Sequence, residues 1–221
     1  IPRAGNYHAE QVPADTQEFA SATAIRKLML EESPAWQSHM PYLCARTLSE
    51  HLGKTYPPMH MDCFFSQLLF LLRRATVSEL QSIVEMSEGL EHRILEAAHQ
   101  DVHTVDDLCT AIKSKRYTYT RIQRTLLHIL LNVTEQYSAK EPAYIRVLGF
   151  NTTGQKLLKE MKQKAQLPIL IRPARQKNEL TEQGRNLLAL DVRATNLYYT
   201  GYANPVLRQT NLDYLRMPVQ V

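Results

Sequence analysis

Apolar residues recur at helical spacing along most of the 221-residue chain, and this pattern constrains its fold more than any other feature. In the first stretch, Ile25, Leu28 and Met29 stand at positions i, i+3 and i+4, and Ser33 with Pro34 ends the pattern. Glycine accounts for only 7 residues, which favours helices over a large sandwich or barrel. We therefore predict a mainly α, multi-helix fold. The further predicted helices cover residues 43–52, 63–74, 77–86, 90–98, 105–112, 120–133, 154–164 and 185–200.

Two short runs rich in β-branched residues interrupt the helical pattern. They cover residues 144–150 and 167–171, and they flank the helix predicted after Asn151. A strand, a helix and a second strand in this order commonly pair in parallel. The sequence therefore predicts a small βαβ insert within the helical domain.

The cysteines and the apolar runs indicate where the protein works. Cys44, Cys63 and Cys109 are odd in number and have no CxxC spacing, which indicates a reducing compartment. No apolar run approaches the roughly 20 residues that a membrane-spanning helix needs. We expect a cytoplasmic protein without a membrane partner, without a signal peptide and without a structural metal. Because the chain begins with Ile1, we also expect it to be a piece of a longer protein.

Basic residues concentrate in two segments that contain no acidic residue. One lies between Asp107 and Glu135 and the other between Glu160 and Glu179. Such charge separation favours a polyanionic partner, since neighbouring like charges repel unless phosphates or counterions neutralise them. Two solvated basic helix faces would produce the same pattern, so both interpretations stay open. The cations of the two segments are Lys113, Lys115, Arg116, Arg121, Arg124, Lys162, Lys164, Arg172, Arg175 and Lys177.

The helix predicted from Ser21 carries its charges in the unfavourable order. It is expected to place two cations, Arg26 and Lys27, in its first turn, where the helix dipole is positive, and two acids at its carboxyl end. This order suits an oxyanion bound at the amino terminus, where N–H groups, hydroxyls and a guanidinium would converge. An ordinary capping hydroxyl with a solvated arginine is the alternative. The predicted phosphate-binding residues are Ser21, Thr23 and Arg26.

A second helix is basic at its positive end. Thr120 and Gln123 have capping-box spacing, which predicts that this helix begins at Arg121. Four cations lie within ten residues, with two tyrosines between them, and nucleic-acid phosphates would relieve their repulsion. A solvated face is again the alternative. The predicted nucleic-acid-binding residues are Lys115, Arg116, Tyr117, Arg121 and Arg124.

Several motifs in the chain resemble those of one known family. The stretch F-A-S-A-T-A-I-R at 19–26 resembles the I-S-S-T-x-I-R motif of H-x-G-H nucleotidyltransferases, which contacts nucleotide phosphates. With the other motifs, the chain from about residue 17 to 202 resembles the carboxyl-terminal half of the bacterial tRNA(Met) cytidine acetate ligase family. The other motifs are E-G-L-E-H-R-I at 88–94, K-R-Y-T-Y-T-R-I-Q-R at 115–124, R-V-L-G-F-N at 146–151 and V-R-A-T-N-L-Y at 192–198.

This resemblance implies a chemistry that the spacing of residues does not show. Enzymes of the family use ATP, with Mg, to activate acetate as acetyl-adenylate, and then acetylate the wobble cytidine of elongator tRNA(Met) to N4-acetylcytidine. The H-x-G-H motif is absent here, so we expect the chain alone to form no acetyl-adenylate. We assign no catalytic residue. Residues 1–33 would be the end of a truncated α/β nucleotide-binding domain, and residues 34–221 the helical tRNA-binding domain.

Two readings without catalysis remain beside the ligase. The same basic surface suits a non-catalytic helical RNA-binding module. It also suits a helical scaffold that meets an acidic protein partner. Salt-dependent tRNA binding separates RNA readings from the scaffold, because each lost phosphate contact lowers the slope of log K against log salt by about 0.9 or somewhat less.

Overall fold

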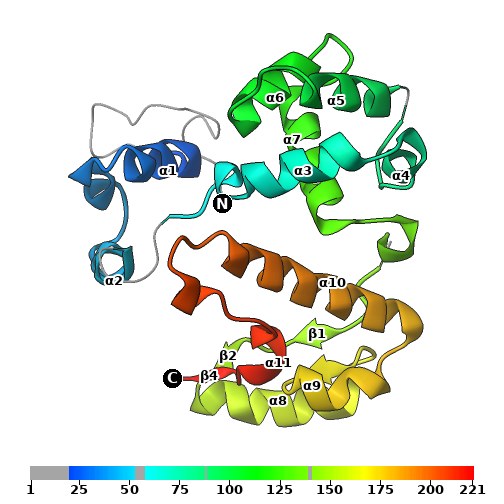
Figure 1. Cartoon of the computed structure of the whole chain (residues 1–221). Coiled ribbons are helices and arrows are strands. Elements are labelled where there is room, and N and C mark those ends of the chain that lie inside the picture. Colours follow the sequence, from blue (N-terminus) through cyan, green and yellow to red (C-terminus); the bar gives the residue numbers. More distant parts are fainter. Residues whose placement is uncertain (1–19, 53–57, 88, 139–140) are drawn as a thin grey trace. The chain divides into compact units, whose positions relative to one another are not determined.

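The computed structural model describes residues 20–52, 58–87, 89–138 and 141–221 (Figure 1). The chain divides into two compact units, one ending at His60 and the other running from Met61 to Val221. The domain boundary expected after residue 33 falls inside the first unit and stays a prediction. Each unit is therefore described by itself.

The first unit is a short run of helices. It holds α1 (Ala22–Leu30), the 3-10 helix η1 (Pro34–His39) and α2 (Tyr42–Leu52). The 3-10 helix packs against both α1 and α2 and buries Trp36. Glu32 adopts a positive φ of 54°, and this left-handed residue turns the chain at the end of α1.

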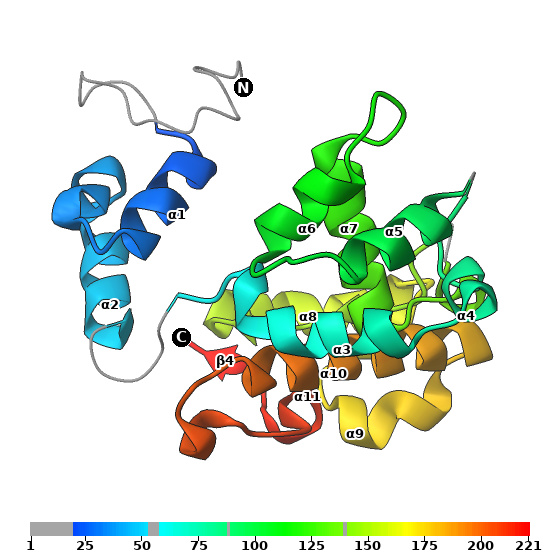
Figure 2. The same cartoon turned by 45° about the horizontal axis from the view of Figure 1, so that its top comes forward.

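The second unit begins with a cluster of helices. Within it α3 packs against α5 and α7, and α6 packs against the same two helices (Figures 1 and 2). Its core consists of leucine and isoleucine side chains at helical spacing, among them the fully buried Leu68, Ile94 and Leu126. The elements are η2 (Met61–Phe64), α3 (Phe65–Arg74), α4 (Val77–Gln81), α5 (Leu90–Ala98), α6 (Val105–Ile112), α7 (Tyr119–Leu131) and η3 (Glu135–Tyr137).

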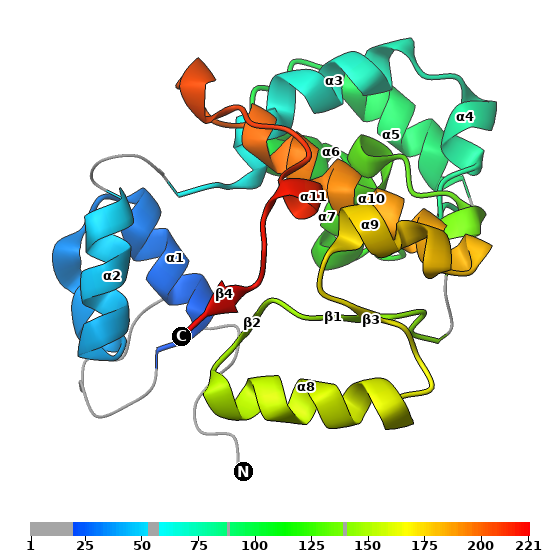
Figure 3. The same cartoon turned by 90° about the horizontal axis from the view of Figure 1, so that it is seen from below.

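The βαβ insert predicted from the sequence is confirmed. Strand β1 (Ile145–Arg146) pairs in parallel with β3 (Ile169–Leu170), and α8 (Thr152–Lys164) connects them. A second parallel pair joins β2 (Gly149–Phe150) to β4 (Val219–Gln220). In Figure 3, α8 lies on one side of the strands and α9 (Pro173–Gln176), α10 (Glu182–Thr200) and α11 (Leu212–Leu215) lie on the other.

Helix α10 joins the two parts of this unit. It packs against α7 in the helix cluster and against η4 (Lys177–Glu179) and α11 in the strand-containing part. Leu188 of α10 is buried with Leu170 and Leu180, and Tyr144 packs against this group. The last described 3-10 helix is η5 (Pro205–Leu207). The mainly helical architecture predicted from periodicity is therefore confirmed, and none of the described helices is long and apolar enough to cross a membrane.

One helix is shorter than predicted. Periodicity indicated a helix to residue 86, but α4 ends at Gln81. The reason is a long-range contact: Ile83 forms an antiparallel bridge with Thr134, and the Val84 N–H donates to the Val133 carbonyl at 2.9 Å. These bonds, with a turn closed by the Met86 N–H to the Ile83 carbonyl at 3.1 Å, take the place of a continued helix.

Candidate nucleic-acid interface

The amino end of α1 carries the predicted phosphate-binding residues. Ser21 is the N-cap, and its Oγ accepts a hydrogen bond from the Ala24 N–H at 3.0 Å. Because the helix begins at Ala22, Arg26 lies in its second turn and not in the first, where we expected it. Thr23 and Arg26 are exposed, and the first turn holds no acidic residue. Ser21 thus stabilises the helix as a cap, while its phosphate-binding role, like that of Thr23 and Arg26, stays a prediction.

Helix α7 begins two residues before the start that the capping-box spacing predicts. Its N-cap is Thr118 and its first residue is Tyr119, so the predicted start at Arg121 is wrong. The side chain of Gln123 donates to the Tyr119 hydroxyl at 3.3 Å and makes no capping contact with Thr120. Arg121 therefore stands in the first turn, and no acidic residue shares that turn.

The Tyr119 side chain fastens α7 to α6. Its hydroxyl donates a hydrogen bond of 2.7 Å to the Asp106 carboxylate. Burial and then this hydrogen bond raise the pKa of Tyr119 above its ordinary value. The phenol therefore stays neutral and has a structural role in this contact.

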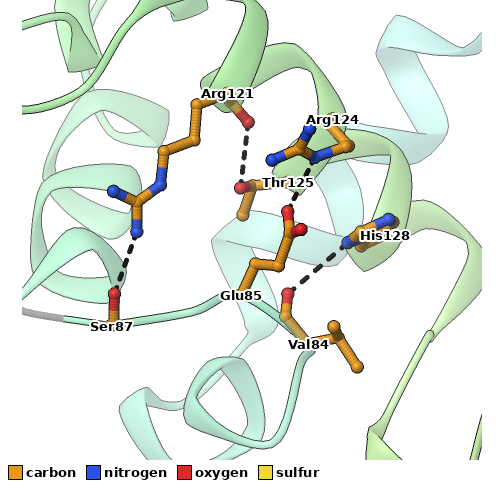
Figure 4. A network of polar contacts seen from close by, with 7 residues as sticks. All are labelled: Val84, Glu85, Ser87, Arg121, Arg124, Thr125 and His128. Carbon is orange, nitrogen blue, oxygen red and sulfur yellow. Dashed lines mark hydrogen bonds and ion pairs between the residues drawn. The ribbon is translucent and has the colours of Figure 1, made fainter. Parts of the chain in front are cut away.

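The two arginines of α7 are both engaged by the chain itself (Figure 4). Arg121 donates to the Ser87 hydroxyl at 2.9 Å, and its guanidinium lies 5.3 Å from the centre of the Tyr117 ring. Arg124 forms an ion pair of 2.7 Å with Glu85. The charge of Arg124 is thus partly neutralised, whereas Arg121 meets a hydroxyl and an aromatic face. We therefore expect Arg121 to attract an added anion more strongly than Arg124, whose charge is partly balanced by Glu85.

The remaining predicted tRNA-binding residues differ in exposure. Lys115 and Arg116 are exposed in the loop before α7. Tyr117 is only 3% exposed, so its ring packs in the unit and offers no open face for a base. The structure therefore brings Tyr117 and Arg121 together. Ser21, Thr23 and Arg26 belong to the other unit.

Sequence reasoning missed Glu85, the ion-pair partner of Arg124. It lies 39 positions before Arg124, outside the acid-free segment, and it adopts a left-handed φ of 64°. The neighbouring Val84 carbonyl lies 3.5 Å from His128 Nδ1, so the segment runs along α7 (Figure 4). A count of charges along the chain gives no signal for such a contact.

A pocket of about 290 Å³ opens beside the strands. Across its wall, the guanidinium of Arg146 in β1 pairs with the carboxylate of Asp213 in α11. Both side chains are largely buried, at 24% and 10% exposure. The pocket lining includes Arg146, Ile171, Thr195, Leu212, Asp213 and Arg216.

Two further kinds of site were considered among the described residues: a metal site and a reactive thiol. No three His, Cys, Asp or Glu side chains there come together as a set that could hold a metal ion. Cys109 is fully buried, and burial, followed by the charges of Asp106 and Asp62, raises the pKa of its thiol to about 12. A thiol in this state is inert near neutral pH.

The family model of the HIGH Nucleotidyl Transferase matches residues 1–213. A relative named tRNA(Met) cytidine acetate ligase, from Thermoanaerobacter sp. (strain X514), is 35% identical over 201 residues, which are 90% of this chain and 48% of the relative. The crystal structure of Thermotoga maritima TmcAL (apo, form I) superimposes with a TM-score of 0.89 and 28% identity, over 99% of this chain and 54% of that one. The same protein bound with alpha-thio ATP gives a TM-score of 0.85 and 29% identity, over 92% and 52%.

The chain thus spans about half the length of the curated relatives it matches. The family match covers residues 1–33 together with most of the helical part. It gives no support to a separate, truncated α/β domain in those first residues. In the described part of that segment, from residue 20 on, the regular element before Pro34 is the helix α1.

Proposed function

The chain belongs to the HIGH nucleotidyl transferase family, and from this membership we propose that it forms the tRNA-binding part, and one side of the ATP site, of a tRNA(Met) cytidine acetate ligase. The observation that carries the proposal is the 35% identity to such a ligase over 90% of this chain. The structural match to TmcAL, which has also been crystallised with an ATP analogue, supports the nucleotide part. The whole reaction would take place in the cytoplasm.

The proposed reaction has two steps. An acetate oxygen attacks the α-phosphorus of ATP, which enters with Mg, and pyrophosphate leaves. The N4 amine of the wobble cytidine of elongator tRNA(Met) then attacks the acetyl carbonyl, loses a proton, and AMP leaves. Negative charge builds up on the phosphates in the first step, so cations and N–H groups fixed near them lower the barrier.

Residues at the start of α1 suit the phosphate end of ATP. The helix end combines the exposed Thr23 hydroxyl with the exposed Arg26 guanidinium one turn further on. A first turn without a carboxylate leaves the positive end of the helix dipole unopposed. Arg26 would hold the departing pyrophosphate.

We expect Arg26→Ala to impair the use of ATP and to spare tRNA binding. The substitution is made in a protein that also carries the H-x-G-H domain of the family. Loss of a charge-assisted contact of about 1.5–3 kcal/mol should raise KM for ATP, or lower kcat/KM, by about tenfold or more. Arg26→Lys keeps the charge and serves as the control. Unchanged ATP kinetics in Arg26→Ala would remove the phosphate role.

We also expect the chain to bind elongator tRNA(Met) more weakly as salt rises. Arg121→Ala should lower the slope of log Kd against log salt by about 0.7–0.9, the value for one phosphate contact. Arg124→Ala should change the slope less, because Glu85 already neutralises part of that charge. Fluorescence anisotropy with labelled tRNA over a range of KCl concentrations measures both slopes.

Glu85→Gln supplies the matched control for this experiment. It removes the carboxylate beside Arg124, so the binding of tRNA should tighten, and Arg124→Ala should then matter as much as Arg121→Ala. Identical salt slopes in the parent and in Arg121→Ala would show that Arg121 contacts solvent and makes no phosphate contact. Binding of tRNA that does not depend on salt would favour the protein-scaffold alternative.

A further inference from the structure

The segment from 151 to 180 carries a second basic surface that the ligase chemistry does not use. Seven Lys and Arg residues lie in it, against the two acids Glu160 and Glu179. All seven basic side chains are exposed in the structure. We call them the α8–α9 surface: Lys156, Lys159, Lys162, Lys164, Arg172, Arg175 and Lys177.

These cations are less neutralised than those of α7. Within the described residues, no carboxylate forms an ion pair with any of them. The ammonium of Lys177 lies 5.8 Å from the centre of the Tyr214 ring, which leaves its charge uncancelled. Arg124, by comparison, is paired with Glu85. The more open cationic surface of this unit is therefore around α8 and α9.

Helix α8 has little structural need for so much charge. It has no buried residue, and Lys156, Lys159 and Lys162 follow one another at three-residue steps, where like charges repel. The helix dipole favours Lys162 and Lys164 in the last turn, but it gives no reason for the first two lysines. A bound polyanion would stabilise the whole arrangement.

Residues of α8 and of the segment after β3 line one hollow at an edge of the strands. The two helices lie on opposite sides of the strands (Figure 3), and the loop 165–168 joins the end of α8 to β3. Lys162, Gln176 and Glu179 line one hollow of about 440 Å³ at this edge. Arg172 and Arg175 follow β3 in the chain, two and five residues after Leu170.

The composition of the segment indicates which form of RNA it fits. Residues 151–180 contain no Phe, Tyr or Trp. Proteins that hold unpaired strands usually stack bases on such rings, whereas double-helical RNA is held mainly through its phosphates and ribose hydroxyls. The lysines of α8 run from Lys156 to Lys164, which is a row about 12 Å long on an α-helix. This combination suits contact with the phosphate backbone and does not suit recognition of individual bases.

We propose that the α8–α9 surface binds the phosphate backbone of a double-helical RNA stem. The proposal rests on the proposed function for the identity of the partner as RNA, and it adds the part of the chain and the form of RNA involved. Contact with backbone phosphates holds the tRNA in place and carries no sequence information. Recognition of particular bases would then fall to other parts of the protein.

The test uses the full 221-residue chain and a variant with Lys162→Gln, Lys164→Gln, Arg172→Gln and Arg175→Gln. All four side chains are exposed, so circular dichroism and thermal unfolding should match the parent. The probes are elongator tRNA(Met), a blunt RNA duplex and single-stranded oligo(U) of the same length. For tRNA and duplex we expect the slope of log Kd against log salt to fall by about 3, since four contacts contribute about 0.7–0.9 each.

A charge-preserving variant is the matched control. It carries Lys162→Arg, Lys164→Arg, Arg172→Lys and Arg175→Lys, and it should keep the parental slope. A parental slope in the glutamine variant, or tighter binding of oligo(U) than of the duplex by the parent chain, would overturn the proposal. Failure of the parent chain to bind tRNA at all would instead contradict the proposed function, so the two failures are distinguishable.

Discussion

Replacing Arg146 with alanine is expected to lower the free energy of unfolding by about 3 kcal/mol, because it leaves a buried carboxylate without its partner. The guanidinium of Arg146 in β1 pairs with Asp213 Oδ1 in α11. The side chain of Asp213 is only 10% exposed, and its Oδ2 has no hydrogen-bond partner in the described part of the chain. Urea unfolding followed by far-ultraviolet circular dichroism measures the loss.

A double variant separates two contributions to the lost stability: the unpaired Asp213 carboxylate and the lost packing of the Arg146 side chain. Arg146→Met with Asp213→Leu removes both charges and keeps apolar volume at the contact. Since buried ion pairs contribute little net stability compared with well-packed apolar residues, we expect the double variant to lose less than Arg146→Ala. A loss below about 1 kcal/mol in Arg146→Ala would mean that water or another donor reaches the carboxylate.

Local sequence patterns predicted those parts of the fold that depend on local physics. Helices α5 and α6 begin and end where periodicity placed them, at 90–98 and 105–112. Thr104 and Asp107 form a capping box at the start of α6, which is a signal contained in four neighbouring residues. The βαβ insert also followed from short runs of β-branched residues. Such features need no knowledge of distant parts of the chain.

The features that the sequence did not predict depend on contacts between distant residues. Strand β4 (Val219–Gln220) lies after the last predicted helix, 185–200, and it pairs with β2 seventy residues away in the sequence, at Gly149 and Phe150. No periodicity in a two-residue strand can indicate that partner. Likewise, Glu85 neutralises Arg124 from outside the acid-free segment. Charge counts along the chain predicted where cations gather, but not which of them stay open to a ligand.

Arg193→Ala is expected to lower the free energy of unfolding by about 2–3 kcal/mol. Arg193 in α10 donates to the carbonyls of Leu131 and Asn132 at the end of α7, at 2.8 and 3.2 Å. Its second nitrogen donates to the Tyr137 hydroxyl at 2.8 Å, and the guanidinium lies 5.1 Å from the centre of that ring. A cation at a helix carboxyl end is favourable, and hydrogen bonds from a charged donor are strong. Urea unfolding of the parent and the variant measures the effect.

Variants of Arg193 test whether the V-R-A-T-N-L-Y stretch at 192–198 has a structural role or contacts a ligand. Arg193→Lys keeps the charge but loses the fork that reaches α7 and Tyr137 together, so it should recover only part of the lost stability. Both substitutions should leave the salt slope of tRNA binding unchanged, because Arg193 is already occupied by carbonyls and a hydroxyl. A fully stable Arg193→Ala variant with a lowered salt slope would reverse this assignment and make the stretch a ligand contact. Lowered stability with an unchanged salt slope would identify Arg193 as a structural contact, through which α10 holds the helix cluster and the strand-containing part of the second unit together.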